Sequence, residues 1–294
     1  MKIKLTDSKF MRNVEKKVLD TIKKYKMFDR KDKIAVAVSG GKDSTVCLYI
    51  LKKLGLNVEA VTVDAVIGNY TKENVDNLKK VCKKYDVKLH TISFRDEFGM
   101  GLCYIQSLLK GKGQNHSSCK ICGILRRYLL NKYCKKQKFD CLATGHNLDD
   151  ESQAILMNLL RNDLKLALRI GPVSGILQTA EFVKRVKPLY FVPEEDVIRY
   201  SKIMKFPVNY GICPCSVGAY RRKHKNFLDE FEKKHPSVKF NIVHMHERLM
   251  SLINPKKLDV GEVNRCKTCG EPAAKDECST CRIFKELKIL KNKK

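Results

Sequence analysis

Short apolar runs alternate with longer amphipathic stretches through the first two thirds of the chain. The apolar runs have the length of β-strands, and they cover residues 34–38, 58–63, 88–94, 140–144 and 182–186. Between them, apolar side chains recur every three or four positions, which predicts helices over 72–85, 121–136, 150–160 and 194–204. Strands that alternate with helices form a parallel sheet covered by helices on both faces. The pattern therefore predicts an α/β fold.

Both ends of the chain depart from this alternation. Residues 8–29 place apolar side chains at helical spacing among lysines, so we expect a basic helix with one packed and one solvated face. Towards the C-terminus, two further helical stretches at 219–234 and 238–253 are rich in Lys, Arg and His, and Pro255 ends the second. Basic helical segments therefore flank the α/β body.

A glycine turn follows the first apolar run, with the sequence Ser39-Gly40-Gly41-Lys42-Asp43-Ser44. Two glycines let the backbone turn tightly and approach an anion, and the free N–H groups of the next helix favour a phosphate there. The hydroxyls of Ser39 and Ser44 can donate hydrogen bonds, and Lys42 adds a positive charge. The spacing differs from a Walker A loop and from a dinucleotide fingerprint, and a strand–turn–helix connection without a ligand is the alternative. We predict that this turn binds nucleotide phosphates.

Polar residues also follow two other predicted strands. Asp64 comes after the second strand, and Gly145 and Asn147 come after the fourth. Ligands of such sheets bind outside the carboxyl ends of the strands, so we expect these residues to converge with the glycine turn on one crevice. Asp150 and Glu151, slightly further on, either cap the next helix or hold Mg²⁺ beside the nucleotide phosphates.

The clearest metal signal is a pair of CxxC motifs near the C-terminus. Four thiolates complete a closed tetrahedral zinc site, which is a structural rather than a catalytic arrangement. The alternative, two redox-active dithiols, fits poorly because no βαβ unit surrounds these motifs. We therefore expect zinc to be held by Cys266, Cys269, Cys278 and Cys281.

A second cysteine set lies within the α/β body. Cys119 and Cys122 open a predicted helix that continues with Arg126 and Arg127, and Cys213 lies far along the chain before a proline. A helix N-terminus and nearby cations are expected to lower the pKa of such thiols and make them nucleophiles or ligands. The set could hold an iron–sulfur cluster by three corners, carry persulfide sulfur, or simply be buried as small apolar groups. Either arginine could neutralise charge that develops on a nucleotide phosphate.

Composition adds a partner to this picture. The 294 residues contain 59 Lys and Arg against 32 Asp and Glu, which gives a net charge of +27. Lys and Arg displace counterions from phosphates, so a nucleic acid is favoured over a merely solvated, lysine-rich surface. Thirteen cysteines without a signal-peptide core indicate a cytoplasmic protein with metal or thiol chemistry, and no apolar run approaches the length of a membrane span.

Taken together, these motifs resemble the TtcA/TtuA family of tRNA 2-thiolation enzymes, and most closely its TtuA/NcsA branch. The family is part of the PP-loop ATP pyrophosphatases, whose adenosine nucleotide α-hydrolase-like fold is a Rossmann-like parallel sheet. The likeness extends over roughly residues 10–285 and rests on the ordered set of motifs rather than on any one. The motifs are residues 39–44, Cys119-x-x-Cys122-Gly123, Thr144-Gly-His-Asn-Leu-Asp-Asp-Glu151, Arg185-Val-Lys-Pro-Leu189, Cys213-Pro214 and the two terminal CxxC pairs around Gly270-Glu271-Pro272.

The resemblance implies a chemistry for the site. ATP would adenylate the C2 oxygen of a tRNA uridine with release of pyrophosphate, and sulfur delivered via a [4Fe-4S] cluster would replace that oxygen. By motif match, residues 39–44 would hold ATP, Asp150 would be the acidic site residue, and Arg126 stands where the family often has lysine. ATP, Mg²⁺, the cluster and Zn²⁺ are the cofactors thus expected. The cluster ligands would be Cys119, Cys122 and Cys213.

The resemblance also implies partners, which are tRNA, a sulfur donor (sulfide or a ubiquitin-like sulfur-carrier protein) and a second copy in a homodimer. Two features depart from the branch. Its members usually begin with a further cysteine-rich zinc finger, whereas the first cysteine here is Cys47. In addition, Cys215 follows Cys213-Pro214, where it could replace Cys213 as a ligand or be a spare thiol, and the position before proline favours Cys213.

Two other functions are compatible with the sequence. One is a cluster-free thiolase that uses persulfide chemistry at the same internal cysteines, and the other is a nucleotide-sensing RNA-binding protein without catalysis. Under each of them the chain divides in the same way. The parts are a basic N-terminal helix (1–30), the PP-loop ATPase/thiolase domain (31–217), a basic helical region (218–260), and a C-terminal zinc finger with a basic tail (261–294).

Overall fold

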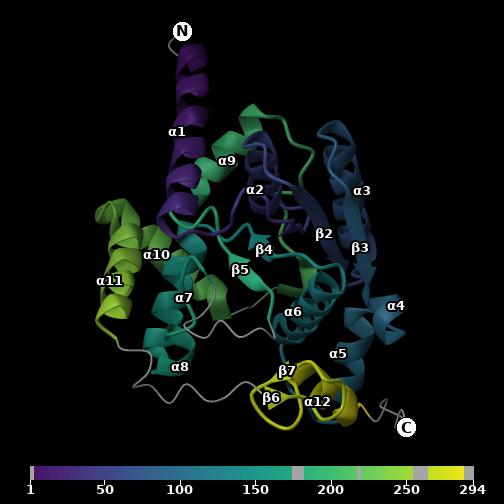
Figure 1. Ribbon diagram of the computed structural model, residues 1–294. Helices are drawn as coiled ribbons and strands as arrows, with labels where there is room; N and C mark the ends of the chain where they lie inside the picture. The colour runs from purple at the N-terminus through teal and green to yellow at the C-terminus, as the bar shows by residue number, and fades with distance from the viewer. Residues whose placement is uncertain (1–2, 174–181, 217–219, 254–263, 288–294) are drawn as a thin grey trace.

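A five-stranded parallel sheet forms the centre of the fold (Figure 1). The computed structural model describes residues 3–173, 182–216, 220–253 and 264–287. The strands are β1 (Ile34–Ala37), β2 (Val58–Asp64), β3 (Leu89–Ser93), β4 (Cys141–Thr144) and β5 (Lys184–Val186), and their order is β3-β2-β1-β4-β5. The chain thus adds β2 and β3 on one side of β1, and then β4 and β5 on the other side. The strand order reverses between β1 and β4, and parallel sheets bind ligands beyond the carboxyl ends of such a strand pair.

Helices pack on both faces of this sheet (Figure 1). Successive strand residues point to opposite faces, so Ile34 and Val36 belong to one buried cluster and Ala35 to the other. The first cluster is completed by α1 (Ile3–Lys24), α2 (Lys42–Lys53), α3 (Gly68–Lys84) and α9 (Glu194–Ile203). The second is completed by α4 (Phe94–Phe98), α5 (Leu102–Gly111), α6 (Ser118–Lys136) and α12 (Ser279–Glu286). The predicted α/β fold with two covered faces is confirmed.

Some elements differ from the prediction. The sequence pattern gave no separate helix for α4, α5 or the short α8 (Leu164–Ala167). Helix α7 (Leu148–Leu160) begins two residues earlier than predicted because Asn147 caps it. The Asn147 side chain accepts the backbone N–H of Asp150 at 3.0 Å, and the Asp150 carboxylate accepts the backbone N–H of Asn147 at 3.3 Å. This reciprocal pair is a capping box, which places Asp150 inside the first turn.

The C-terminal helices pack against the start of α7. Helices α10 (Tyr220–Lys234) and α11 (Val238–Leu252) both contact α7, and α11 carries Lys239, whose side chain is only 7% exposed. The Lys239 ammonium forms ion pairs with Asp149 of α7 and with Asp229 and Glu232 of α10. A buried charge is tolerated only with such partners. These pairs fix the C-terminal helices beside the carboxyl ends of the strands.

A small unit follows these helices in the described chain. Strands β6 (Asn264–Arg265) and β7 (Pro272–Ala273) form an antiparallel pair, and α12 comes after them. The unit lies under α5 and α6 in Figure 1 and packs on α6. The Phe284 ring of α12 lies 4.8 Å from that of Phe98, centroid to centroid, and Asn131 of α6 donates a hydrogen bond to Glu271 at 3.2 Å. The unit is therefore joined to the second core cluster.

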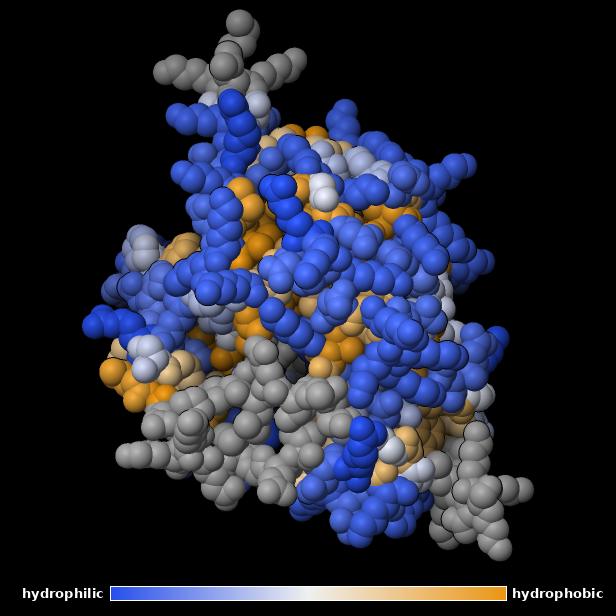
Figure 2. All heavy atoms as spheres, viewed as in Figure 1, coloured by the Kyte–Doolittle hydropathy of each residue, from blue (hydrophilic) through white to orange (hydrophobic). Residues whose placement is uncertain are grey.

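The surface is largely hydrophilic. Figure 2 shows polar side chains over most of the face in view, with apolar residues between them. Nearly all lysines in the described ranges are exposed or half-buried. None of the helices in these ranges combines the length and the apolar content that crossing a bilayer requires.

Candidate functional site

The turn between β1 and α2 is shaped by its own glycines and hydroxyls. Gly40 has a φ of +83°, which favours glycine, and a Cβ there would lie 2.6 Å from the Cβ of Asn74. Ser44 is buried, and its Oγ accepts the N–H of Ser39 at 3.1 Å and donates to the carbonyl of Gly41 at 3.1 Å. Within the described ranges no side chain caps α2, and Gly41, Lys42 and Asp43 line a cavity, so the start of this helix is available to a ligand.

The loops after β1 and β4 lie in direct contact. A Cβ at Gly145 would lie 2.6 Å from the backbone nitrogen of Ser44, so only glycine permits this approach. The approach lets Asn147 donate from Nδ2 to Oδ1 of Asp43 at 2.9 Å. The structure thus brings together the two loops that the sequence places at neighbouring strand ends.

Two carboxylates, those of Asp43 and Asp150, lie close enough at this contact to influence each other electrostatically. Burial, opposed by Lys42 and reinforced by the negative charge of Asp150, raises the pKa of Asp43 above its ordinary value. Asp150 also receives an ion pair from Arg221 of α10 at 3.0 Å. The capping role considered for Asp150 is therefore present in the structure, and its charge still acts on Asp43. Oxygen donors of this kind are those that Mg²⁺ prefers.

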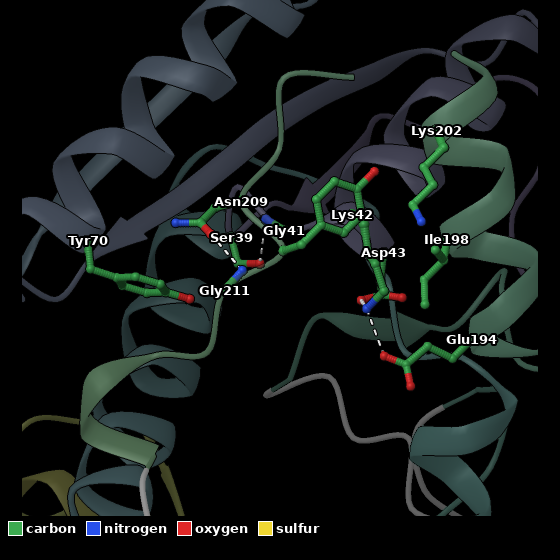
Figure 3. Close-up of a pocket in the computed structure, with 11 residues that line it drawn as sticks. Ser39, Gly41, Lys42, Asp43, Tyr70, Glu194, Ile198, Lys202, Asn209 and Gly211 are labelled. Carbon is green, nitrogen blue, oxygen red and sulfur yellow. Dashed lines mark hydrogen bonds and ion pairs between the residues drawn. The ribbon is translucent and has the colours of Figure 1, made fainter. Parts of the chain in front are cut away.

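A cavity of about 460 Å³ opens beside the turn (Figure 3). This volume falls within the range of about 300–1,000 Å³ that is typical of ligand pockets. Within it, Lys42 reaches toward Glu194 of α9, with 2.7 Å from Nζ to Oε1, and lies 3.0 Å from Oδ2 of Asp43. The lining residues are Ser39, Gly41, Lys42, Asp43, Tyr70, Glu194, Ile198, Lys202, Asn209, Tyr210 and Gly211.

A smaller cavity of about 110 Å³ adjoins the first. The two share Ser39 and Tyr70 in their walls. The wall of the smaller cavity also contains Asp64 from the end of β2, together with Cys122 and Arg126 of α6 and the distant Cys213. The predicted phosphate-binding turn and the internal cysteines therefore face adjoining hollows.

The internal cysteines come together from two parts of the chain. Cys119 and Cys122 lie in the first turn of α6, which Ser117 caps. Cys213 immediately precedes the 3₁₀ turn Pro214–Ser216, which packs on α6. The Cys119 thiol donates to the backbone carbonyl of Cys215, with a sulfur–oxygen distance of 3.7 Å.

The expectation that their surroundings lower the pKa of these thiols is wrong. Burial raises the pKa of Cys122, and the neighbouring Arg126 only partly opposes it. Burial, followed by the charge of Cys213, likewise raises the pKa of Cys119. Removal from water outweighs the favourable cation here, so without a metal the two thiols hold their protons at neutral pH. Metal binding would release those protons.

One donor atom of the Arg126 side chain lacks a hydrogen-bond partner in the described ranges. Its Nε is buried, and no described residue accepts a hydrogen bond from it. Arg127 is exposed, so of the two arginines it is Arg126 that faces the smaller cavity. The unpaired Nε of this half-buried guanidinium fits an anionic ligand. Cys122 and Cys213 line the same cavity, and with Cys119 they are the thiols that could hold an iron–sulfur cluster by three corners.

The four C-terminal cysteines form a compact sulfur cage. Their Sγ atoms all lie within 4.8 Å of one another, and the Cys269–Cys278 separation is 3.8 Å. Four sulfurs at about 2.3 Å from a tetrahedral zinc would stand at closely similar separations. Although burial opposes it, the N–H of Cys278 and other backbone donors lower the pKa of Cys266 to about 6, which favours a thiolate. Cys266, Cys269, Cys278 and Cys281 therefore fit zinc.

Several cavity residues carried no functional signal in the sequence. Glu194 is one of three acidic residues in the first turn of α9, a pattern that only indicates a helix start. Tyr70 lies in the first turn of α3, among residues that suggested no ligand. Asn209 and Tyr210 lie just before Cys213 in an irregular segment, and this closeness to a candidate cysteine was the one available hint.

The model of the PP-loop domain matches residues 10–208, which is more than half of the chain. The chain belongs to the PP-loop family. The glycine turn of residues 39–44 is thus its PP-loop, and the cavity in Figure 3 opens beside it.

Relatives of this PP-loop protein match nearly its whole length. A tRNA-5-methyluridine(54) 2-sulfurtransferase of Pyrococcus horikoshii is 35% identical over 96% of this chain and 88% of its own. The tRNA 2-thiolation protein NcsA of Haloferax volcanii is 31% identical over 97% and 94%. A solved structure, the U34-tRNA thiolase NcsA from Methanococcus maripaludis with its [4Fe-4S] cluster, matches with a TM-score of 0.82 at 31% identity, covering 98% of this chain and 91% of that one. The resemblance to the TtuA/NcsA branch is confirmed.

Proposed function

We propose that this PP-loop protein is an ATP-dependent tRNA 2-thiouridine synthase. It adenylates the C2 oxygen of a tRNA uridine and replaces that oxygen with sulfur delivered via a [4Fe-4S] cluster. The relatives support the activity, since the Pyrococcus horikoshii protein is named a 2-sulfurtransferase of 5-methyluridine 54 in tRNA and the Methanococcus maripaludis protein a U34-tRNA thiolase.

One observation carries the proposal. The cavity beside the PP-loop and the cavity beside Cys122 and Cys213 share Ser39 and Tyr70, so a nucleotide phosphate and a sulfur-bearing group can meet at one target base. A nucleotide sensor has no need for thiols at this place. The arrangement suits activation and substitution at adjacent positions, which is the order that the reaction requires.

The bonds change in two steps. In the first, the C2 oxygen of the uridine attacks the α-phosphorus of ATP, the bond from that phosphorus to the bridging oxygen breaks, and pyrophosphate leaves. In the second, a sulfide sulfur bonds to C2, the C2–O bond breaks, and AMP leaves with that oxygen. Arg126 stabilises the charge on the α-phosphate through its unpaired Nε. Because its guanidinium stays protonated, Arg126 holds charge and does not shuttle a proton.

The PP-loop supplies the nucleotide contacts. The open N–H groups at the start of α2 and the side chains of Ser39 and Lys42 face the phosphates, while Gly40 and Ser44 fix the shape of the turn. Gly145 and Asn147 hold the neighbouring loop against it. Asp64 lies in the wall of the smaller cavity, near the expected reaction centre.

Metal groups complete the proposed site. Cys119, Cys122 and Cys213 would hold the [4Fe-4S] cluster, which would supply an open iron position to carry sulfur. Asp43 and Asp150 would hold Mg²⁺ beside the phosphates. Zinc in the C-terminal cage would hold the small unit in its folded shape, and that unit packs through α12 on α6, the helix that also bears the first two cluster cysteines.

The large positive charge supports tRNA as the macromolecular partner. With a net charge of +27, the chain attracts a polyanion over a wide surface. The sulfur donor is sulfide or a ubiquitin-like sulfur-carrier protein, and the working unit is a homodimer, as the family resemblance implies.

Anaerobic purification followed by a thiolation assay tests the proposal. We expect a brown protein with about four irons per chain, and 2-thiouridine in digested tRNA only when ATP and a sulfur source are both supplied. A colourless, iron-free protein that still thiolates tRNA would replace the cluster with persulfide chemistry. If no condition gives ATP-dependent sulfur incorporation, the enzyme proposal is wrong.

A further inference from the structure

Glu194 joins two lysines that come from distant parts of the chain. Its Oε1 lies 2.7 Å from Nζ of Lys42 in the PP-loop, and its Oε2 forms an ion pair with Nζ of Lys225 on α10. Although burial raises the pKa of Glu194, the hydrogen bonds from Lys225 and Lys42 lower it to about 2. Glu194 is therefore the carboxylate that the two lysines share, and each lysine has a further acidic partner, Asp43 for Lys42 and Asp229 for Lys225.

This carboxylate lies in the wall of the cavity beside the PP-loop and contacts its lysine. Lys42 and Glu194 both line the larger cavity, and Lys202 extends into the same cavity from α9 (Figure 3). A carboxylate presents two anionic oxygens to two donors, and a phosphate group presents a similar pair of oxygens with more negative charge. Two of the three N–H donors of Lys42 already face Glu194 and Asp43. The Glu194 carboxylate would also repel a polyphosphate, so a phosphate that takes Lys42 as its main partner must rearrange this contact.

We propose that Glu194 is a removable stand-in for the terminal phosphates of ATP, which displace it and take Lys42 and Lys225 as their partners. The subsite would then be specific for a diphosphate, with Lys202 as a third cation at its edge. This inference rests on the proposed function for the identity of the nucleotide. It also makes the C-terminal helix α10 part of the ATP site.

This arrangement should make the site bind ATP more tightly than AMP. A ligand that displaces Glu194 must replace its contacts to both lysines, which a β,γ-diphosphate does and a single α-phosphate at the PP-loop does not. Pyrophosphate should therefore bind the subsite on its own. When pyrophosphate has left, Glu194 returns to the lysines and AMP is held only by its remaining contacts.

Calorimetric titration of the full-length, anaerobically purified protein with ATP, pyrophosphate and AMP tests this. Lys225→Met is expected to weaken ATP and pyrophosphate by roughly ten- to a hundredfold, as expected for a lost hydrogen bond between charged groups, and to leave AMP unchanged. Lys225→Arg keeps the positive charge and should retain most of the wild-type affinity for ATP and pyrophosphate. Glu194→Gln removes the competitor, so ATP and pyrophosphate should bind more tightly while AMP again stays unchanged. The matched control is Lys223→Met, an exposed position on the same helix.

The outcomes separate this inference from the function on which it rests. If the wild-type chain binds ATP and Lys225→Met binds ATP and pyrophosphate equally well, the diphosphate subsite is wrong and the proposed function stands. An equal loss of AMP affinity in Lys225→Met would also overturn the diphosphate subsite, because it would indicate a general effect of the lost charge or of a disturbed fold. A wild-type chain that binds neither ATP nor pyrophosphate overturns both.

Discussion

Replacing Gly145 with alanine tests the contact between the two loops that build the site. The new Cβ would lie 2.6 Å from the backbone nitrogen of Ser44 and 2.7 Å from the backbone carbon of Asp43. Backbone atoms cannot rotate away as a side chain can. The loops must therefore separate by roughly 0.8 Å to reach the 3.4 Å of ordinary van der Waals contact.

The cost of this separation has two parts. Overpacking of this kind typically costs about 1–3 kcal/mol. The 2.9 Å hydrogen bond from Asn147 to Asp43 is also stretched, and losing a hydrogen bond to a charged group costs about 1.5–3 kcal/mol. Because the loops can relax, we expect a net loss of about 2–4 kcal/mol in unfolding free energy, or roughly 3–7 °C in Tm for a chain of 294 residues. ATP affinity should fall about tenfold, because the start of α2 moves.

Thermal unfolding and ATP titration of the variant measure both effects. Gly111→Ala is the matched control, since a Cβ there meets nothing within 4 Å at the end of a helix. The control should unfold at or slightly above the wild-type temperature. A Gly145→Ala variant that matches wild type in both Tm and ATP affinity would refute the argument from close contact.

The remaining predictions concern the cysteines and the charges. Cys122→Ser should abolish cluster assembly and spare ATP binding, and full iron occupancy in that variant would exclude Cys122 as a ligand. Chelating zinc should loosen the C-terminal unit and, because that unit packs on α6, lower the iron content while ATP binding is retained; complete loss of ATP binding would contradict this. Stability should decline as the pH falls from 4.5 toward 2, because Glu194, although buried, has its pKa lowered to about 2 by Lys225 and Lys42, whereas the unfolded chain takes up that proton near 4.5. Acid unfolding, monitored by circular dichroism, should show a smaller loss of stability for Glu194→Gln than for wild type. Identical profiles for the two proteins would count against a stabilising role of the ion pairs.

Local pattern was sufficient for much of the fold. All five strands of the central sheet were predicted, and the signal is clearest for the inner strands β1, β2 and β4, because strands buried on both faces are mostly apolar. The edge strands β3 and β5 mix polar and apolar residues, and the alternation of strands with helices indicated them. The PP-loop and the CxxC pairs were visible because their chemistry depends on residues that are neighbours in sequence. By contrast, α5 was not predicted, although its buried Leu102, Ile105 and Leu109 stand at helical spacing.

What the sequence did not predict depends on contacts between distant residues. Glu194 meets Lys42 across 152 positions, and no local pattern marks either as the partner of the other. The raised pKa of Cys122 likewise follows from burial under the folded chain, which its CxxC motif does not reveal. The need for glycine at Gly145 arises only where its loop meets Ser44.

An isotope experiment tests the central claim, adenylation of the base followed by exchange of oxygen for sulfur. A tRNA carrying ¹⁸O at C2 of its target uridine is incubated anaerobically with the cluster-loaded protein, ATP and sulfide, and the AMP and pyrophosphate are examined by mass spectrometry. We expect one ¹⁸O atom in each AMP formed with 2-thiouridine, and none in pyrophosphate. Unlabelled AMP accompanying the thiolated product, or label in pyrophosphate, would contradict it.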